Sequence, residues 1–370
     1  MLAYILLVVF PSIIFLLYHF PVTAYGDNAL LKRQCWWKNR NAKTLSAFFV
    51  IYFLLLALRA DTVGVDLQQY LPRFQTIAQS SFSELVALSE SVDPGYIAIN
   101  KLISFFSRNN QFFLAVIAAC TVIPIAILYK KESEHAMLSI SIFLILPLFS
   151  MFFSGLRQTL AIAMVVPAFY CAKNKKRLLF LLTVLIAYLF HSAGIFIILL
   201  YPVYRAKITK KWLFVVIPAM VFVYIFNVQI FNFVLQFMGE KYQERYSELS
   251  DTGAYTMIVL FIMFAVYSFV VVNDKQLDET TLGMRNLLLL SIVLQFFAPI
   301  NPIAMRVNYF YILFIPLLIS RITMRCKQDY IQIVGIARIL MCCFFVCYFF
   351  YKAFFGTDTL EVFPYLPFWS

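Results

Sequence analysis

Charged side chains are scarce in this chain of 370 residues: Asp, Glu, Lys and Arg make up 13% of it, whereas 63% is hydrophobic. A soluble globular chain is typically about a quarter charged and about half apolar. The shortage of charge therefore excludes a water-soluble domain and predicts a polytopic membrane protein. At about 20 residues for each transmembrane helix, the length allows roughly a dozen spans, so we expect one all-α integral membrane domain over 1–370.

Several kinds of site are also missing. Histidine occurs three times, and the seven cysteines form neither a CxxC pattern nor a paired framework, which argues against a metal centre and structural disulfides. No HExxH, GxSxG, Walker A or GxGxxG motif occurs, so hydrolytic and nucleotide-driven classes are disfavoured. We expect no metal, no cofactor and no nucleic-acid partner. The N-terminus lacks a basic leader and a cleavage site, which favours a retained span over a signal peptide.

What is present is a series of apolar runs bounded by charged or turn residues. Twenty Lys and Arg residues fall on one side of the resulting alternation and nine on the other, so the basic side is predicted to be cytoplasmic. Both termini then face outward, as do a first periplasmic loop over 59–109 and a second over 231–254. The twelve predicted spans lie near 2–20, 45–58, 110–129, 136–153, 157–172, 178–190, 192–204, 212–230, 254–273, 286–300, 305–320 and 331–351.

Two ambiguous segments are assigned by the same charge bias. Residues 95–107 could cross the membrane, but Asn100, Lys101 and Ser104 share one helical stripe, which favours a helix in the outer interface. Residues 178–204 have basic clusters at both ends, which predicts a hairpin that turns at His191. Each arm of about 13 residues rises only about 20 Å, against a hydrocarbon core of about 30 Å. We therefore expect His191 to lie in an outward-facing cavity.

Three arginines at the predicted outer ends are candidate pyrophosphate ligands. Arg157 begins a span whose N-terminus faces outward, and a helix N-terminus attracts anions. Arg306 repeats this arrangement, and Arg59 opens the first outer loop. Together they could bind a pyrophosphate without a metal. The alternatives are snorkelling side chains and, for Arg59, an ion pair with Asp61.

Two outward residues compete for the role of general base. His191 is a lone histidine whose neutral form burial would favour, and ionisable groups at membrane depth are often functional. Asp66 could instead deprotonate a hydroxyl, although a neighbouring arginine would lower its pKa. We favour His191 as the base and Asp66 as the residue that positions the acceptor. A hydrogen-bonded core histidine remains the alternative.

The second outer loop has glutamates four residues apart, at Glu240, Glu244 and Glu248, with aromatic residues between them. This spacing predicts an amphipathic surface helix. Tyr242 and Tyr246 are candidates for stacking on sugar rings, and a solvated lid is the alternative.

Short motifs recur in order along most of the chain. They comprise Arg59, Gly64, Asp66, Tyr70, Asp93, Pro94, Gly95, Tyr96, Asn100, the 154–158 turn with Gln158, Ala161, Phe190, His191, Ser192, Arg306, Tyr309, Phe310, Pro364 and Tyr365. Together these motifs resemble the EpsG family, whose members are similar to Wzy-type polysaccharide polymerases.

The resemblance implies a GT-C-like membrane glycosyltransferase that moves a growing glycan from undecaprenyl pyrophosphate to a lipid-linked repeat unit, on the periplasmic face of the bacterial inner membrane and without a nucleotide sugar. A chain-length regulator and a flippase are the partners it implies. Members often carry Glu at the position of Asp93, and they are often described with both termini cytoplasmic.

Within that resemblance we assign substrate binding to Gln158, Tyr70, Asp93, Tyr96 and Asn100. Two other functions stay open. A ligase that attaches the finished glycan would share the same short motifs. A flippase or transporter for lipid-linked oligosaccharides is expected to show internal repeats, and the sequence has no evident repeat.

Overall fold

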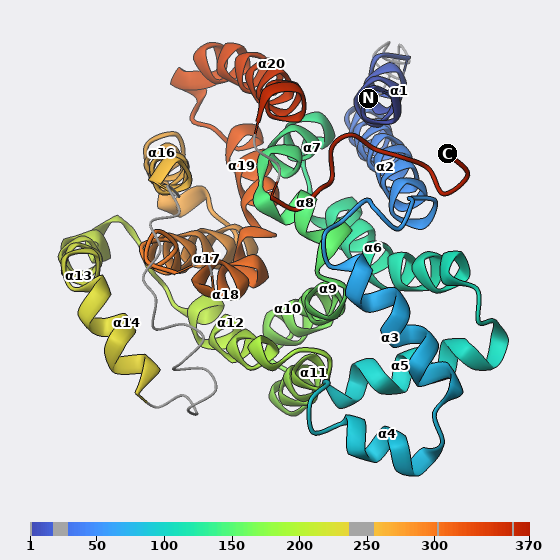
Figure 1. The fold of residues 1–370 in the computed structure, drawn as a ribbon. Coiled ribbons are helices and arrows are strands. Elements are labelled where there is room, and N and C mark those ends of the chain that lie inside the picture. The colour runs from blue at the N-terminus through green and yellow to red at the C-terminus, as the bar shows by residue number, and fades with distance from the viewer. Residues whose placement is uncertain (1, 18–28, 237–254, 302, 357–358) are drawn as a thin grey trace.

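The computed structural model describes residues 2–17, 29–236, 255–301, 303–356 and 359–370. Within these ranges the chain is built of helices, and its one extended pairing is an isolated bridge between Arg59 and Pro367 (Figure 1). The all-α prediction is therefore confirmed. The helices are α1 (Leu2–Leu17), α2 (Ala29–Ala57), α3 (Leu67–Gln79), α4 (Phe82–Leu88), α5 (Pro94–Phe106), α6 (Asn110–Glu132), α7 (Ala136–Ile145), α8 (Pro147–Ser154), α9 (Leu156–Ala163), α10 (Val165–Lys173), α11 (Arg177–Phe190), η1 (Ser192–Leu199), α12 (Leu200–Arg205), η2 (Lys210–Trp212), α13 (Leu213–Ile225), α14 (Asn227–Leu235), α16 (Tyr255–Val270), η3 (Asp274–Gln276), α17 (Glu279–Gln295), α18 (Ile303–Ile312), α19 (Ile315–Met324), η4 (Gln328–Tyr330) and α20 (Ile331–Phe355).

Membrane-spanning helices are fewer, by length and composition, than the twelve expected. In the described part of the chain, four helices are long and apolar enough to cross a membrane: Trp36–Ala57, Asn110–Glu132, Met305–Met324 and Gln328–Phe355. Two bent pairs raise the number to six, and the three shorter apolar helices are α1, α11 and α16. A membrane protein is confirmed, and the number twelve is not.

Breaks within the predicted spans explain the difference. The segment predicted as one span over 136–153 bends by 66° between α7 and α8, where Pro147 begins a new helix. The interval 157–172 divides at Met164 between α9 and α10, and 212–230 divides at Phe226 between α13 and α14. Pro147 marks the first of these breaks in the sequence. The composition of an apolar run by itself gives no sign of a bend, because both halves of a broken helix are apolar.

The hairpin predicted at His191 is present. Helix α11 ends at Phe190, and the chain reverses into η1, which packs against it. A Cβ added to Gly194 would lie 2.6 Å from the carbonyl oxygen of Ala187, so the close approach of the two arms requires glycine there.

The predicted first outer loop is a small helical unit rather than a simple connection. Helices α3, α4 and α5 lie together beside α6 (Figure 1), and the apolar faces of α3 and α5 share a core with α6 and α9. Asn100 of α5 is fully buried, and the Lys101 ammonium donates to the carbonyls of Ala78 (3.1 Å) and Ser80 (2.9 Å) at the end of α3. The polar stripe of α5 thus faces protein, whereas Phe105 and Phe106 are exposed.

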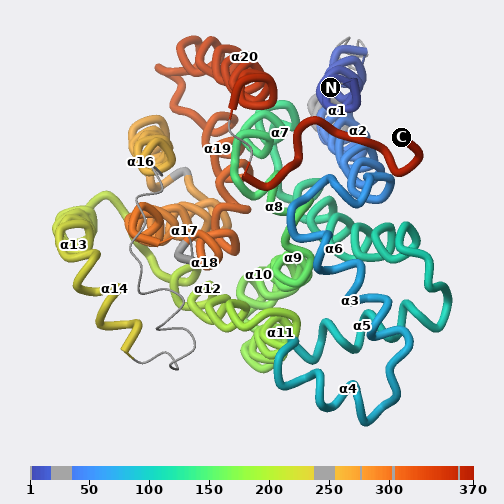
Figure 2. The backbone as a smooth tube through the Cα atoms, in the orientation of Figure 1, coloured from blue at the N-terminus to red at the C-terminus, as the bar shows by residue number. Residues whose placement is uncertain are grey.

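The two ends of the chain lie close together, and both lie on this same side of the fold (Figure 1). The C-terminal tail, residues 359–370, runs along the start of the outer loop (Figure 2). The amide of Ala60 donates to the carbonyl of Leu366 (2.8 Å), and the amide of Gly64 donates to that of Glu361 (2.9 Å). The Tyr4 hydroxyl of α1 donates to the carbonyl of Val362 (2.7 Å).

Charged residues of the predicted cytoplasmic connections form a separate network. The Arg321 guanidinium of α19 lies 2.6 Å from Asp278 and 3.2 Å from Glu132, and Lys173 at the end of α10 lies 2.8 Å from Glu132. Arg325 pairs with Asp278 at 3.0 Å. The sequence-based division of the charges into two sides therefore corresponds to two separate clusters in the fold.

Candidate functional site

The break between α8 and α9 is the point at which most of the sequence motifs meet. The outer-loop segment 59–66 lies along residues 152–154, because Arg59 donates to the carbonyl of Phe152 (3.4 Å) and Asp66 contacts Ser154. The Ser154 hydroxyl donates to Asp66 Oδ2 at 2.8 Å, and the Asp66 amide lies 3.3 Å from the same hydroxyl oxygen. Ser154 therefore fixes both the backbone and the carboxylate of Asp66.

Gly64 permits this contact. Its φ is +107°, in the region that favours glycine. A Cβ on Gly64 would also lie 2.1 Å from the carbonyl oxygen of Phe153. Any side chain at this position would push the loop away from the helix break, so Gly64 sets the place of Asp66.

Arg157, in the first turn of α9, is the centre of a polar cluster. Its Nη1 lies 2.8 Å from Asp93 Oδ2, and its Nε lies 3.5 Å from the Tyr70 hydroxyl. The Tyr70 ring stacks edge-on with Tyr96 at 5.6 Å between centroids. Both charged side chains of the ion pair stay partly exposed, so a ligand can reach them.

Asp93 connects this cluster to the His191 hairpin. It precedes α5 as its N-cap residue, and burial raises the pKa of its carboxyl although Arg157 and the backbone amide of Ser192 act in the opposite direction. One carboxylate thus joins the starts of α5 and η1 to Arg157. The sequence suggested a substrate-binding residue here and gave no sign of the ion pair.

His191 caps the start of η1. Its Nδ1 accepts the backbone N–H of Ala193 at 3.1 Å. Burial lowers its pKa to about 3, with further lowering from Arg157 and Arg306, so the imidazole is neutral at ordinary pH. Since a neutral imidazole has one acceptor and one donor nitrogen, Nε2 carries the proton. In this geometry His191 offers a hydrogen-bond donor, and its role as a base stays a prediction.

Gln158 joins α9 to α18. Its buried side-chain amide donates to the carbonyl of Arg306 at 2.6 Å, whereas the Arg306 side chain itself is exposed. Arg306 and Arg157 both lower the pKa of His191, so both arginines lie near enough to the hairpin turn for their charges to act on it. The amide of Gln158 is therefore engaged with protein rather than free for a substrate.

The remaining candidates lie deeper or elsewhere. Arg59 is only 2% exposed, and burial lowers its pKa to about 10. No ion pair between Arg59 and Asp61 occurs among the described residues. Tyr96 and Asn100 are fully buried. Tyr242 and Tyr246 lie outside the described residues, with the helix predicted around them.

The sequence did not predict the contact between Ser154 and Asp66, although the position of Ser154 at a helix end was a partial indication of it. Ser154 was part of the motif, yet its hydroxyl had no predicted role until the fold placed it beside Asp66. A serine at the end of one helix and directly before a glycine is a typical site for a side-chain hydrogen bond that replaces a helical one. Its partner, 88 positions away, could not be read from the chain.

Comparison with known families gives a match. The model of the EpsG family matches residues 43–366, which include every described residue of the cluster. No curated protein and no solved structure gives a significant match.

Proposed function

Because the chain belongs to the EpsG family, we propose that it is a polysaccharide polymerase that joins undecaprenyl-pyrophosphate-linked repeat units by glycosyl transfer. We place the reaction on the periplasmic face of the bacterial inner membrane. The donor and acceptor glycans, the surrounding lipids, a chain-length regulator and a flippase are its proposed partners.

One observation carries the proposal. Charged and polar residues from sequence positions as far apart as Asp66 and Arg306 converge on the start of α9. Arg157 is the part-exposed cation of this group, and it lies in the first turn of a helix, where free amides favour an anion. A lipid-linked pyrophosphate has the charge and the tethered geometry that suit such a site.

In the proposed reaction an acceptor hydroxyl attacks the anomeric carbon of the donor glycan. The new glycosidic bond forms as the bond from that carbon to the pyrophosphate oxygen breaks, and the pyrophosphate leaves with the bonding electrons on its lipid. Arg157 and Arg306 would stabilise the charge that develops on this leaving group. Donor binding requires Arg157 to exchange or share its contact with Asp93.

The proton of the attacking hydroxyl passes, in our proposal, to Asp66. The Ser154 hydroxyl donates to Asp66 Oδ2, so Oδ1 is the oxygen that accepts the proton of the attacking hydroxyl. His191 donates its Nε2–H to a pyrophosphate oxygen. This proposal moves the base role from His191 to Asp66 and gives His191 a role at the leaving group. A good leaving group lowers the demand for a strong base, so a carboxylate suffices.

We propose that the reaction needs no metal ion. The described residues contain no group of three His, Cys, Asp or Glu side chains able to hold one, and arginines supply the positive charge instead. Purified enzyme is expected to polymerise in excess EDTA. Activity that disappears and returns with Mg²⁺ or Mn²⁺ would contradict this.

The test of the function is deletion of the gene in its native strain, followed by separation of the surface polysaccharide by size on a gel. Loss of long chains with single repeat units retained is the expected result, and the wild-type gene must restore the long chains. Intact long chains left unattached would indicate a ligase. Repeat units trapped on the cytoplasmic side would indicate a flippase.

A further inference from the structure

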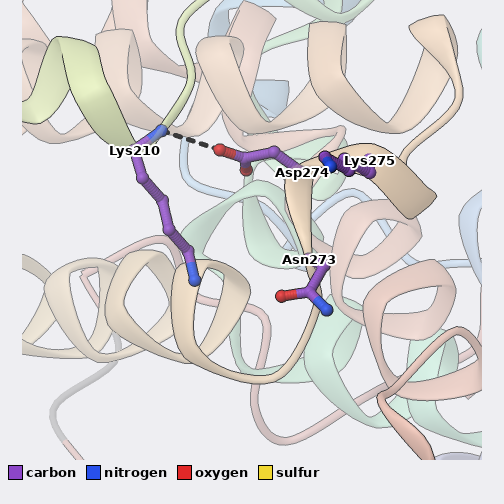
Figure 3. A pocket seen from close by; sticks show the side chains of 4 residues that line it. All are labelled: Lys210, Asn273, Asp274 and Lys275. Carbon is purple, nitrogen blue, oxygen red and sulfur yellow. Dashed lines mark hydrogen bonds between the residues drawn. The ribbon is translucent and has the colours of Figure 1, made fainter.

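A hollow of about 580 Å³ lies away from the Arg157 cluster. It is formed between the connection that joins α12 to α13 and the connection that joins α16 to α17, and no residue of the cluster lines it. Figure 3 shows the side chains around it, which are Lys210, Asn273, Asp274 and Lys275.

The single carboxylate of the hollow already has one cationic partner and one backbone amide partner. Asp274 Oδ2 accepts the backbone N–H of Lys210 at 2.8 Å (Figure 3), and Oδ1 accepts from Arg285 Nη2 at 2.9 Å. Arg285 is fully buried, with its guanidinium 4.0 Å above the ring of Phe269. Its charge balances that of Asp274, so the charges of Lys210 and Lys275 are left without a matching carboxylate in the lining.

Exposed apolar side chains stand next to the lining residues in the sequence on both connections. Trp212 is 55% exposed and Phe214 is 87% exposed, directly after Lys210 and Lys211. Val270, at the end of α16, is also exposed. Exposed apolar side chains of this kind face hydrocarbon in a membrane protein, and tryptophan favours the boundary between hydrocarbon and water. The hollow therefore opens where lipid headgroups lie.

We infer that this hollow binds the phosphate of an anionic phospholipid, whose acyl chains lie along α13 and α16. Two unmatched ammonium groups complement the phosphate, and the neighbouring apolar side chains select a lipid over a free phosphate ion. The basic connections lie on the predicted cytoplasmic side, whose leaflet is the anionic one. This site goes beyond the proposed function and does not depend on it.

The experiment measures lipid bound to the purified full-length protein by native mass spectrometry, with phosphatidylglycerol or phosphatidylcholine added. The test variant is Lys210→Gln with Lys275→Gln. Its matched control is Lys207→Gln with Lys211→Gln, which removes two exposed lysines of the same region that do not line the hollow. Of these four lysines, only Lys210 and Lys275 line the hollow. We therefore expect a loss of phosphatidylglycerol binding of roughly tenfold or more in the test variant, and a clearly smaller loss in the control variant, whose lysines act only through the general surface charge.

A second variant tests whether a loss of binding comes from the lost charges or from misfolding. Lys210→Arg with Lys275→Arg keeps both charges and is expected to bind phosphatidylglycerol like the wild type. Equal binding of phosphatidylcholine, an equal loss in the control variant, or wild-type binding by the glutamine variant would overturn the inference. Complete displacement of the lipid by millimolar inorganic phosphate would indicate a free-phosphate site and would overturn it as well.

Discussion

Arg157 contributes both charge and geometry at the scale of the single residue. Its guanidinium contacts Asp93 and Tyr70 through different nitrogens, which a lysine cannot reproduce. We expect Arg157→Lys to lower polymerisation by about a hundredfold, the usual effect of removing one charge-stabilising donor. Arg205→Lys is the matched control, since Arg205 forms an ion pair with the exposed Glu279 outside the cluster. Wild-type activity of Arg157→Lys at normal expression would contradict the assignment.

His191 can be tested as a donor rather than a base. Glutamine offers an N–H near the position of Nε2 but cannot act as a base, so His191→Gln should keep far more activity than His191→Ala. The control is His135→Ala, because His135 also caps a helix through Nδ1, at 3.2 Å from the Leu138 amide.

The pH dependence separates the two roles of His191 further. With a pKa of about 3, His191 is neutral above about pH 4 and does not titrate near its ordinary value of about 6.5. The pH–activity profile of the wild type should therefore have no limb near pH 6.5. A limb there that His191→Gln abolishes would restore the base role.

Replacement of Gly64 should displace the Asp66 side chain while Asp66 itself stays unchanged in sequence. Gly64→Ala places a Cβ at 2.1 Å from the Phe153 carbonyl oxygen and at a φ of +107°, so we expect activity to fall by at least tenfold. The matched control is Gly335→Ala, since nothing lies within 4 Å of a Cβ at Gly335. Equal activity of the two variants would show that the position of Asp66 is unimportant.

At the scale of elements, the C-terminal tail supports the loop that carries Asp66. Its backbone holds residues 58–65 through four hydrogen bonds between 2.8 and 3.0 Å. Deletion of 359–370 should release the loop that carries Asp66 and strongly reduce polymerisation while the protein still inserts in the membrane. The last of these bonds involves Phe368. Deletion of residues 369–370 alone therefore keeps all four bonds and should leave polymerisation unchanged. Full activity of the longer deletion would contradict the supporting role.

At the scale of the whole molecule, the loop that carries Asp66 and the C-terminus must lie on one side of the membrane. We expect Asp61→Cys and Ser370→Cys, in a background without the seven native cysteines, to react with an impermeant maleimide in right-side-out vesicles. Lys176→Cys and Lys211→Cys should react only after permeabilisation. The reverse pattern would place the Arg157 cluster in the cytoplasm and reject the periplasmic proposal.

The sequence by itself determined that this is an all-helical membrane protein, and it predicted how the charges divide between two sides. Low charge and long apolar runs require helices in a membrane, because unpaired backbone groups are too costly there. The alternation of basic clusters separated the residues near Arg157 from those near Arg321, since charges resist crossing the bilayer. The turn at His191 followed from the same rule.

Only the tertiary structure decided which partners meet. The ion pair between Arg157 and Asp93 joins residues 64 positions apart, and the contact of Ser154 with Asp66 spans 88. Contacts of this range depend on how the helices pack, which no local pattern encodes. The burial of Arg59 has the same origin. Composition fixes whether a segment is helical and apolar, whereas the neighbours that surround each polar side chain are set by three-dimensional packing.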